Sequence, residues 1–206
     1  TKRIAVPGCY PTAVTLGIGP AIAAGLTDGG DLVVVAASGT SGAGKSTAPH
    51  LMASAAIGSM SAYGVGGGHR HVPEMLQNLR LYGAASPTIS FTPMLAPMTR
   101  GILATITAPV AADLTPTRVR ATYAAAYDNE PFVRLLPAGQ WPTTASVHGS
   151  NMVSLQVAVD QSAGRLVVVA AIDNLVKGTA GGAIQSMNLA LGLPEGLGLT
   201  MNGVAP

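Results

Sequence analysis

Seven stretches of the chain have the apolar pattern of β-strands. Residues 32–37 and 166–172 are unbroken apolar runs, and we expect the first to be a strand covered on both faces. Residues 101–108 alternate instead, with Ile102, Ala104 and Ile106 on one side, which indicates a half-buried strand. The predicted strands are 1–6, 32–37, 88–93, 101–108, 132–136, 153–159 and 165–172, the last two joined by a hairpin at 160–164.

Helical periodicity predicts four further elements. Residues 13–26 form one helix, which Thr12 can cap at its N-terminus. Thr115 and Pro116 begin another helix that runs to residue 127, and a shorter helix opens at Pro73 and Glu74. The last is 173–192, where three glycines cost helix stability but allow close approach of the backbone to a neighbour. In the helix from Thr115 the positions on one face are Val119, Tyr123 and Ala126. In the shorter helix the predicted core positions are Met75, Leu76 and Leu79.

The composition limits the class of protein. A length of 206 residues fits one domain, which we take as 1–206. Only 10% of residues are charged, against about 25% in an average domain, while 48% are hydrophobic, so we expect a large subunit or interdomain interface. The net charge of +2 without a Lys/Arg cluster predicts no nucleic-acid partner. No segment has the length of a membrane span and no signal-peptide pattern is present, so we expect a cytoplasmic protein.

Cys9 is the only cysteine, and it follows a Pro7-Gly8 turn directly before the first predicted helix. The free N–H groups and the dipole of a helix N-terminus favour the thiolate, which is the nucleophilic form. One cysteine cannot form an internal disulfide, which fits a reducing compartment and leaves the thiol available. A buried structural cysteine is the alternative.

A glycine-rich segment offers a rival function. Residues Gly39 to Ser46 satisfy the phosphate-loop pattern G-x-x-x-x-G-K-[ST]. In that case the loop backbone would cradle a nucleotide, Lys45 would reach its phosphates and Ser46 would hold magnesium, with Asp173 after a second strand. Pro49 weakens this nucleoside-triphosphatase alternative, because it lies where the first turn of the nucleotide-binding helix should form.

Charged and imidazole side chains gather in one short segment. His69, Arg70 and His71 are followed by Glu74 in a chain with few charges. His-x-His could form a metal pair on a strand, but without nearby cysteines it is a poor ligand set, so we predict no metal. Each histidine alone could equally be structural, as we expect for His148. Arg100 could bind a carboxylate or phosphate through its guanidinium fork, or could be a solvated loop residue.

Four motifs resemble those of the N-acetyl-gamma-glutamyl-phosphate reductase family of arginine biosynthesis. The segment around Cys9 is the most specific, and the His-Arg-His-x-Pro-Glu segment is matched at every position. At Met94 the chain departs from the histidine of many members, so that position is given no chemistry. The matching segments are 4–13 with Gly17, Ile18 and Pro20, then 38–44, 69–74 and 91–102.

The resemblance assigns roles to individual residues. It implies that Cys9 is the catalytic nucleophile and His69 the general acid/base. Arg70, His71, Glu74 and Arg100 become candidates for orienting these groups or binding the substrate. Asn174, Lys177 and Gly178 are implied to lie near the nicotinamide of NADP. The implied fold is α+β, a mixed, largely antiparallel sheet with helices on one face, as in the catalytic domains of glyceraldehyde-3-phosphate and aspartate-semialdehyde dehydrogenases.

The resemblance also implies a reaction and missing sequence. The family reduces an acyl phosphate, N-acetyl-glutamyl 5-phosphate, to N-acetylglutamate 5-semialdehyde through a cysteine thioester, with NADPH as hydride donor. Its members begin with a Rossmann domain carrying G-x-G-x-x-G, which is not found in 1–206. We therefore expect an N-terminal NADP-binding domain upstream of Thr1, to which the helix 173–192 returns, and a homodimer or homotetramer. A non-catalytic dimerisation fragment and an aspartyl-phosphate enzyme remain alternatives.

Overall fold

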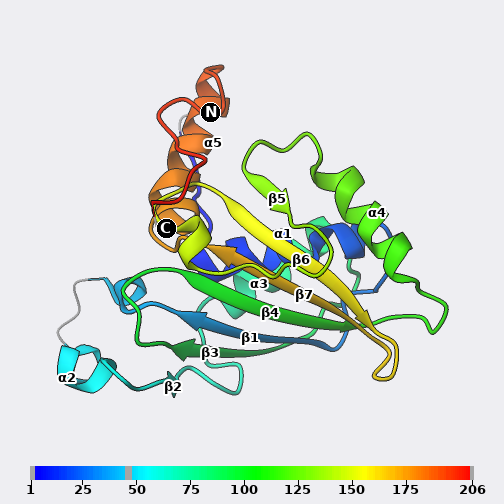
Figure 1. Cartoon of the computed structure of the whole chain (residues 1–206), viewed down its shortest axis with the longest axis horizontal. Coiled ribbons are helices and arrows are strands. Elements are labelled where there is room, and N and C mark those ends of the chain that lie inside the picture. Colours follow the sequence, from blue (N-terminus) through cyan, green and yellow to red (C-terminus); the bar gives the residue numbers. More distant parts are fainter. Residues whose placement is uncertain (1–2, 45–47, 205–206) are drawn as a thin grey trace.

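The computed structural model of the chain describes residues 3–44 and 48–204, and within them the strands form one mixed sheet (Figure 1). The order across this seven-stranded sheet is β2-β3-β1-β4-β7-β6-β5. The β1/β3 and β5/β6 pairs are parallel and the other four are antiparallel. The strands are β1 Leu32–Ser38, β2 Ser61–Ala62, β3 Ile89–Leu95, β4 Ile102–Pro109, β5 Val133–Leu135, β6 Val153–Asp160 and β7 Arg165–Ile172.

The main helices pack on one face of this sheet. The long helix α1 (Cys9–Ala23) lies against β4 and β7, with α3 and α4 beside it. This arrangement confirms the predicted α+β fold class. The helices are α1, α2 Ala53–Ala56, α3 Val72–Leu81, α4 Pro116–Tyr127 and α5 Gly181–Leu191; short 3₁₀ turns occupy Thr40–Ala43, Pro49–Leu51 and Ala145–Val147, and a π-helical turn occupies Val176–Ala180.

The strands have one buried and one open face. In β4 burial alternates along the strand, as predicted, with Ile102, Ala104 and Ile106 buried. In β1, by contrast, Val33 and Val35 are 37% and 41% exposed. Within the described residues of a single chain the helices cover only the other face, so this chain alone does not cover 32–37 on both faces as expected.

The beginning of the chain differs from the prediction. Residues 3–6 form no strand, and α1 starts at Cys9 rather than Ala13. Gly8 occupies the N-cap position in an extended conformation, while the hydroxyl of Thr12 donates to the carbonyl of Gly8 at 2.9 Å. Thr12 is thus inside the helix and is not its cap, so Cys9 is the first helical residue.

A proline inside α1 is accommodated by α4. Pro20 has no N–H to offer the carbonyl of Leu16, four residues earlier. The hydroxyl of Tyr127 donates to that carbonyl at 2.5 Å, and Tyr123 donates to the next one, Gly17, at 2.7 Å. The side chains that α4 buries are Val119, Tyr123 and Tyr127, whereas Ala126, placed by the sequence on the same face as Val119 and Tyr123, is exposed.

The end of the chain is not one continuous helix. The predicted helix 173–192 is divided into the π-helical turn 176–180 and α5. In α4 the predicted start is confirmed, because the hydroxyl of Thr115 accepts from the N–H of Arg118 at 3.3 Å. None of the helices in the described ranges is both long enough and apolar enough to cross a membrane.

Replacing Tyr127 by Phe tests the α1–α4 contact. The change leaves the carbonyl of Leu16 without its donor, so we expect the free energy of unfolding to fall by about 1–3 kcal/mol. Urea unfolding followed by circular dichroism measures this. Tyr82→Phe is the matched control, since the Tyr82 ring packs on Gly19 through carbon atoms; an equal loss in both variants would contradict the role of the Tyr127 hydroxyl.

Candidate functional site

Cys9 lies in the wall of a pocket of about 230 Å³ at the N-terminus of α1. The pocket brings together residues from the end of β1, the glycine-rich loop, β2 and the segment before α3. Cys9, His69, Arg70 and His71 all line it, although Cys9 is 60 or more residues away from the others in sequence. The remaining lining residues are Tyr10, Ser38, Gly39, Gly42, Ala43, His50, Leu51, Ser61, Tyr63 and Leu95.

Two glycines allow neighbouring groups to approach Cys9 closely. A Cβ atom on Gly8 would lie 2.5 Å from Nε2 of His71, so only glycine permits the imidazole to lie there. A Cβ atom on Gly178 would lie 2.6 Å from Cβ of Cys9 itself. The N–H of Gly8 also donates to Oε1 of Glu74 at 2.9 Å. Glu74 therefore orients the residue before the cysteine.

The environment of the thiol has two opposing effects on its pKa. Burial raises the pKa of Cys9, whereas the N–H groups of Tyr10 and Cys9 at the helix N-terminus and the charge of Arg70 lower it. Burial is the larger effect, so the pKa lies above its ordinary value. The helix N-terminus thus favours the thiolate, as expected, but in this chain burial outweighs it.

The two histidines are neutral at pH 7 and form a pair. Their ring centroids are 4.9 Å apart, and burial is the largest of the causes that lower the pKa of both below its ordinary value, with the charge of Arg70 a smaller one. In His69 the Coulomb effect of His71 also contributes. Nδ1 of His69 accepts from the backbone N–H of His71 at 3.1 Å, so Nε2 of neutral His69 carries the proton. Nδ1 of His71 is buried and has no hydrogen-bond partner among the described residues.

Two tyrosines in the pocket were not singled out from the sequence. The hydroxyls of Tyr10 and Tyr63 are 2.7 Å apart and form a hydrogen bond, and both rings make edge contacts with the ring of His69. Burial raises the pKa of both tyrosines, so they remain neutral hydrogen-bonding groups. Tyr10 follows Cys9 in the first motif, so its presence in the pocket could have been predicted. Tyr63 belongs to none of the four motifs, and nothing in the sequence places it beside Tyr10.

Arg100 and Asn174 lie outside the lining of this pocket. Nη2 of Arg100 is 3.0 Å from both carboxylate oxygens of Asp173, which is completely buried. The side chain of Asn174 accepts from the N–H of Gly101 at 2.7 Å and donates to the hydroxyl of Ser41 at 3.0 Å. Both side chains thus bond to other residues of the chain. Arg100 was predicted to bind the substrate and Asn174 the cofactor, but the contacts that the structure shows for them are structural.

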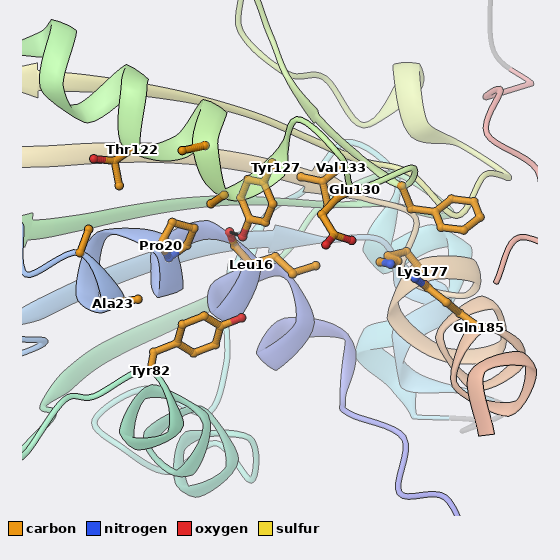
Figure 2. Close-up of a pocket in the computed structure, with 14 residues that line it drawn as sticks. Leu16, Pro20, Ala23, Tyr82, Thr122, Tyr127, Glu130, Val133, Lys177 and Gln185 are labelled. Carbon is orange, nitrogen blue, oxygen red and sulfur yellow. Dashed lines mark hydrogen bonds between the residues drawn. The ribbon is translucent and has the colours of Figure 1, made fainter. Parts of the chain in front are cut away.

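Lys177 faces a different cavity, a groove of about 740 Å³ between α1, α4 and the terminal segment (Figure 2). Figure 2 shows Lys177 and Gln185 at one end of it and Ala23 and Thr122 at the other. Nζ of Lys177 donates to Oε1 of Gln185 at 2.7 Å and lies 5.5 Å from the centre of the Phe132 ring. This groove is larger than the Cys9 pocket, but it has neither a thiol nor an imidazole in its lining.

The glycine-rich loop does not have the geometry of a phosphate loop. The N–H groups of Thr40, Ser41 and Gly42 donate to the carbonyls of Met98, Thr99 and Gly39, so they do not point at a ligand. The loop continues into a 3₁₀ turn, and Asp173 is occupied by Arg100. Lys45 and Ser46 of the proposed motif lie outside the described residues. The nucleotide-binding alternative therefore has no support from 39–44.

No group of three or more His, Cys, Asp or Glu side chains in the described parts of the chain is arranged to hold a metal ion. The chemistry available in the pocket is that of a thiol, three imidazoles, two phenols and a guanidinium group. Such a set is suited to nucleophilic attack with proton transfer.

Comparison with known proteins gives one matching family and many relatives. Residues 9–174 match the family described as semialdehyde dehydrogenase, dimerisation domain. The chain is 64% identical over 206 residues to the N-acetyl-gamma-glutamyl-phosphate reductase of Streptomyces coelicolor, 63% to that of Thermobifida fusca and 62% to that of Micrococcus luteus. Each match covers the whole chain but 60% of the relative, so the chain spans about three fifths of their length.

Solved structures of lower identity share the fold. Aspartate semialdehyde dehydrogenase II of Vibrio cholerae has a TM-score of 0.72 at 16% identity, covering 90% of this chain and 61% of that one. A probable aspartate-semialdehyde dehydrogenase of Pseudomonas aeruginosa has a TM-score of 0.69 at 18% identity, with the same two coverages. At these identities the likeness concerns the fold alone.

The stability of the chain should depend on pH through Lys177. Burial lowers the pKa of Lys177 to about 8, while the charges of Glu195 and Glu130 raise it in part. Between pH 8 and the ordinary pKa of 10.5, Lys177 is protonated in the unfolded chain but has lost its proton in the folded chain. The free energy of unfolding therefore rises with pH in this range. Lys177→Met should therefore be more stable than the parent at pH 7, by about 1–3 kcal/mol, and the difference should shrink towards pH 10.

Urea unfolding of parent and variant at the two pH values measures this difference. Gln77→Met, on the exposed side of α3, is the control and should show no pH-dependent difference from the parent. A Lys177→Met difference that stays constant from pH 7 to pH 10 would show that the lysine is not titrating in this range.

Proposed function

The chain belongs to the family of semialdehyde dehydrogenase dimerisation domains, as its motifs predicted, and we propose that it is the catalytic part of an N-acetyl-gamma-glutamyl-phosphate reductase. The complete enzyme would reduce N-acetyl-glutamyl 5-phosphate to N-acetylglutamate 5-semialdehyde and phosphate in arginine biosynthesis. The observation that carries the proposal is the position of Cys9 at the start of α1, in one pocket with His69 and His71. The printed names of the relatives supply the substrate.

Cys9 acts as the nucleophile in this proposal. Its sulfur attacks the acyl carbon of the substrate, the carbon–oxygen bond to phosphate breaks, and phosphate leaves with the electron pair, so that a thioester remains on Cys9. Sulfur is suited to this step because the thiolate is a strong nucleophile near neutral pH and a good leaving group afterwards. NADPH, when bound, supplies the hydride that reduces the thioester. The carbon–sulfur bond then breaks, which releases the aldehyde and the thiolate.

A histidine moves the protons in these steps. Because the pKa of the thiol is raised and those of both imidazoles are lowered, the resting pair is a neutral thiol beside a neutral imidazole. An imidazole takes the thiol proton as the sulfur attacks, and returns it to the thiolate that is released when the reduced intermediate collapses to the aldehyde. We assign this role to His69, whose Nδ1 gives up its hydrogen bond with the N–H of His71 to take the proton. His71 lies against Gly8 and positions the turn before the thiol.

The substrate is held by the polar wall of the pocket. Arg70 lines it and offers the cation closest in sequence to the histidines, so we assign it to the phosphate of the substrate. Glu74 instead holds the N–H of Gly8, which makes it a positioning residue. Nη2 of Arg100 is bonded to Asp173 and its side chain does not line this pocket, so we do not assign Arg100 to the substrate here.

Only one of the three proposed cofactor residues contacts Cys9. Gly178 lies against its Cβ atom and fits the nicotinamide end of NADP, whereas the side chains of Asn174 and Lys177 are bonded within the chain. The rest of the cofactor would be held by an N-terminal Rossmann domain. The exposed apolar side chains of α5 support such a domain, because they need a cover; they are Ile184, Met187, Leu189 and Leu191.

We also assign the open face of the sheet to self-association. Val33 and Val35 are exposed on it, and the chain has too few charges to cover its surface with polar groups. The family description as a dimerisation domain supports the same use. We expect a dimer or tetramer in sedimentation at micromolar concentration, and a clean monomer of the complete enzyme would contradict the assignment.

Replacing Cys9 by Ser in the complete reductase tests the proposed function. We expect kcat/KM to fall by at least about a thousandfold with folding unchanged, because a serine hydroxyl is a far poorer nucleophile at pH 7. His69→Asn should cost about 10²–10⁴-fold. His148→Asn is the matched control outside the pocket and should stay close to the parent. Activity of Cys9→Ser within tenfold of the parent would refute the assignment.

A further inference from the structure

We propose that Asp173 is a positioning residue for Cys9: its buried carboxylate fixes the π-helical turn 176–180, and this turn holds Gly178 against the cysteine. The proposal rests on the proposed role of Cys9 as the nucleophile. It concerns a residue that touches neither the thiol pocket nor the substrate, and that the family motifs did not single out.

The carboxylate of Asp173 is completely buried and fully bonded. Oδ1 accepts from the backbone N–H groups of Leu175 at 2.8 Å and Val176 at 2.9 Å. Oδ2 accepts from the N–H of Gly149 at 2.7 Å, and Nη2 of Arg100 lies 3.0 Å from both oxygens. Burial alone would raise the pKa of this carboxyl, but the hydrogen bonds outweigh it and the pKa lies below its ordinary value. The group is thus a buried anion that caps the turn.

The backbone of the same residue closes the turn. The carbonyl of Asp173 accepts from the N–H of Gly178 at 3.0 Å, and that of Leu175 accepts from Ala180 at 2.9 Å. Both bonds span five residues, which is the spacing of a π-helix. Single π-helical turns are rare and are frequent at functional sites. The carboxylate of Asp173 therefore fixes the beginning of the turn, and the backbone carbonyl of Asp173 holds Gly178.

The turn contacts Cys9 through the backbone of Gly178. A Cβ atom on Gly178 would lie 2.6 Å from Cβ and 3.0 Å from Cα of Cys9, so the glycine backbone is in direct contact with the residue. A one-residue change of the turn, from π-helical to α-helical spacing, would rotate Gly178 away from this contact. Gly178 is thus one of the groups that enclose Cys9.

The next residue, Asn174, connects the same turn to the wall of the Cys9 pocket through hydrogen bonds. Asn174 bonds to the N–H of Gly101 and the hydroxyl of Ser41, and its carbonyl accepts from the hydroxyl of Thr179 at 2.8 Å. Ser41 belongs to the glycine-rich loop, in which Gly42 lines the Cys9 pocket. The Asp173-Asn174 pair therefore connects two sides of the site, the turn beside the thiol and the loop opposite.

Alkylation of Cys9 by iodoacetamide tests the proposal, because the chain has no other cysteine. In Asp173→Asn the cap is weakened and water reaches the thiol, so its apparent pKa should fall and the alkylation rate at pH 7.5 should rise about tenfold, equivalent to about one pH unit. In the complete reductase kcat should fall about a hundredfold, because the sulfur is misplaced. A residue that only stabilised the fold would not move these two rates in opposite directions in the folded protein.

Two further variants make the result decisive. Gly178→Ala separates the turn from Cys9 while leaving the Asp173 carboxylate and its hydrogen-bond donors unchanged, and it should raise the alkylation rate in the same way. Arg165→Gln removes a distant ion pair with Asp31 and should leave the rate within twofold of the parent. Circular dichroism and the thermal midpoint establish that each variant is folded; if Asp173→Asn is not, Gly178→Ala decides.

The positioning role would be overturned if both folded site variants were alkylated at rates within twofold of the parent. If Asp173→Asn does not fold, the same result for Gly178→Ala alone would overturn it. Because alkylation needs no substrate, that failure is distinct from a failure of the proposed reductase activity, which is measured by the turnover of Cys9→Ser.

Discussion

The close approach of two glycine backbones to Cys9 is the contact on which the rest of the site depends. Gly8 leaves room for the imidazole of His71 on one side, and Gly178 lies against Cβ of the cysteine on the other. A side chain at either position would collide with its neighbour, so both positions require glycine. The side-chain carboxylate of Glu74, on α3, accepts from the N–H of Gly8, and the backbone carbonyl of Asp173, in the terminal segment, accepts from the N–H of Gly178. The thiol is thus positioned by elements far apart in sequence.

This enclosure determines how the chemistry can proceed. The helix N-terminus and Arg70 favour the thiolate, but burial opposes them and is stronger, while burial also keeps both histidines neutral. The site therefore holds a neutral thiol and a neutral base until a substrate arrives, and the proton moves as the sulfur attacks. An anionic acyl phosphate near Arg70 would enter a pocket that carries no resident thiolate to repel it.

Much of the fold could be predicted from the sequence, because local patterns determine it. The alternation at Ile102, Ala104 and Ile106 predicts the buried face of β4, and the Pro7-Gly8 turn before a helix predicts that Cys9 lies at a helix N-terminus. The strand expected at the beginning of the chain is absent from 3–6, because short apolar runs do not distinguish strands from extended coil. The open face of β1 could not be predicted, since apolar runs do not reveal whether the cover comes from the same chain.

The site was predicted only in part, for a similar reason. Cys9, His69 and His71 could be named from motifs, but the partners of Arg100 and Asn174 lie up to 133 residues away and depend on the tertiary structure. The sequence around Tyr63 does not indicate that this residue bonds to Tyr10 in the pocket.

The most direct measurement of the central claim is mass spectrometry of the complete reductase after it is mixed with acyl phosphate in the absence of NADPH and quenched in acid. We predict an acyl adduct on the peptide containing Cys9, formed with release of one phosphate per site. An adduct on another residue, or phosphate release with no adduct, would contradict the account.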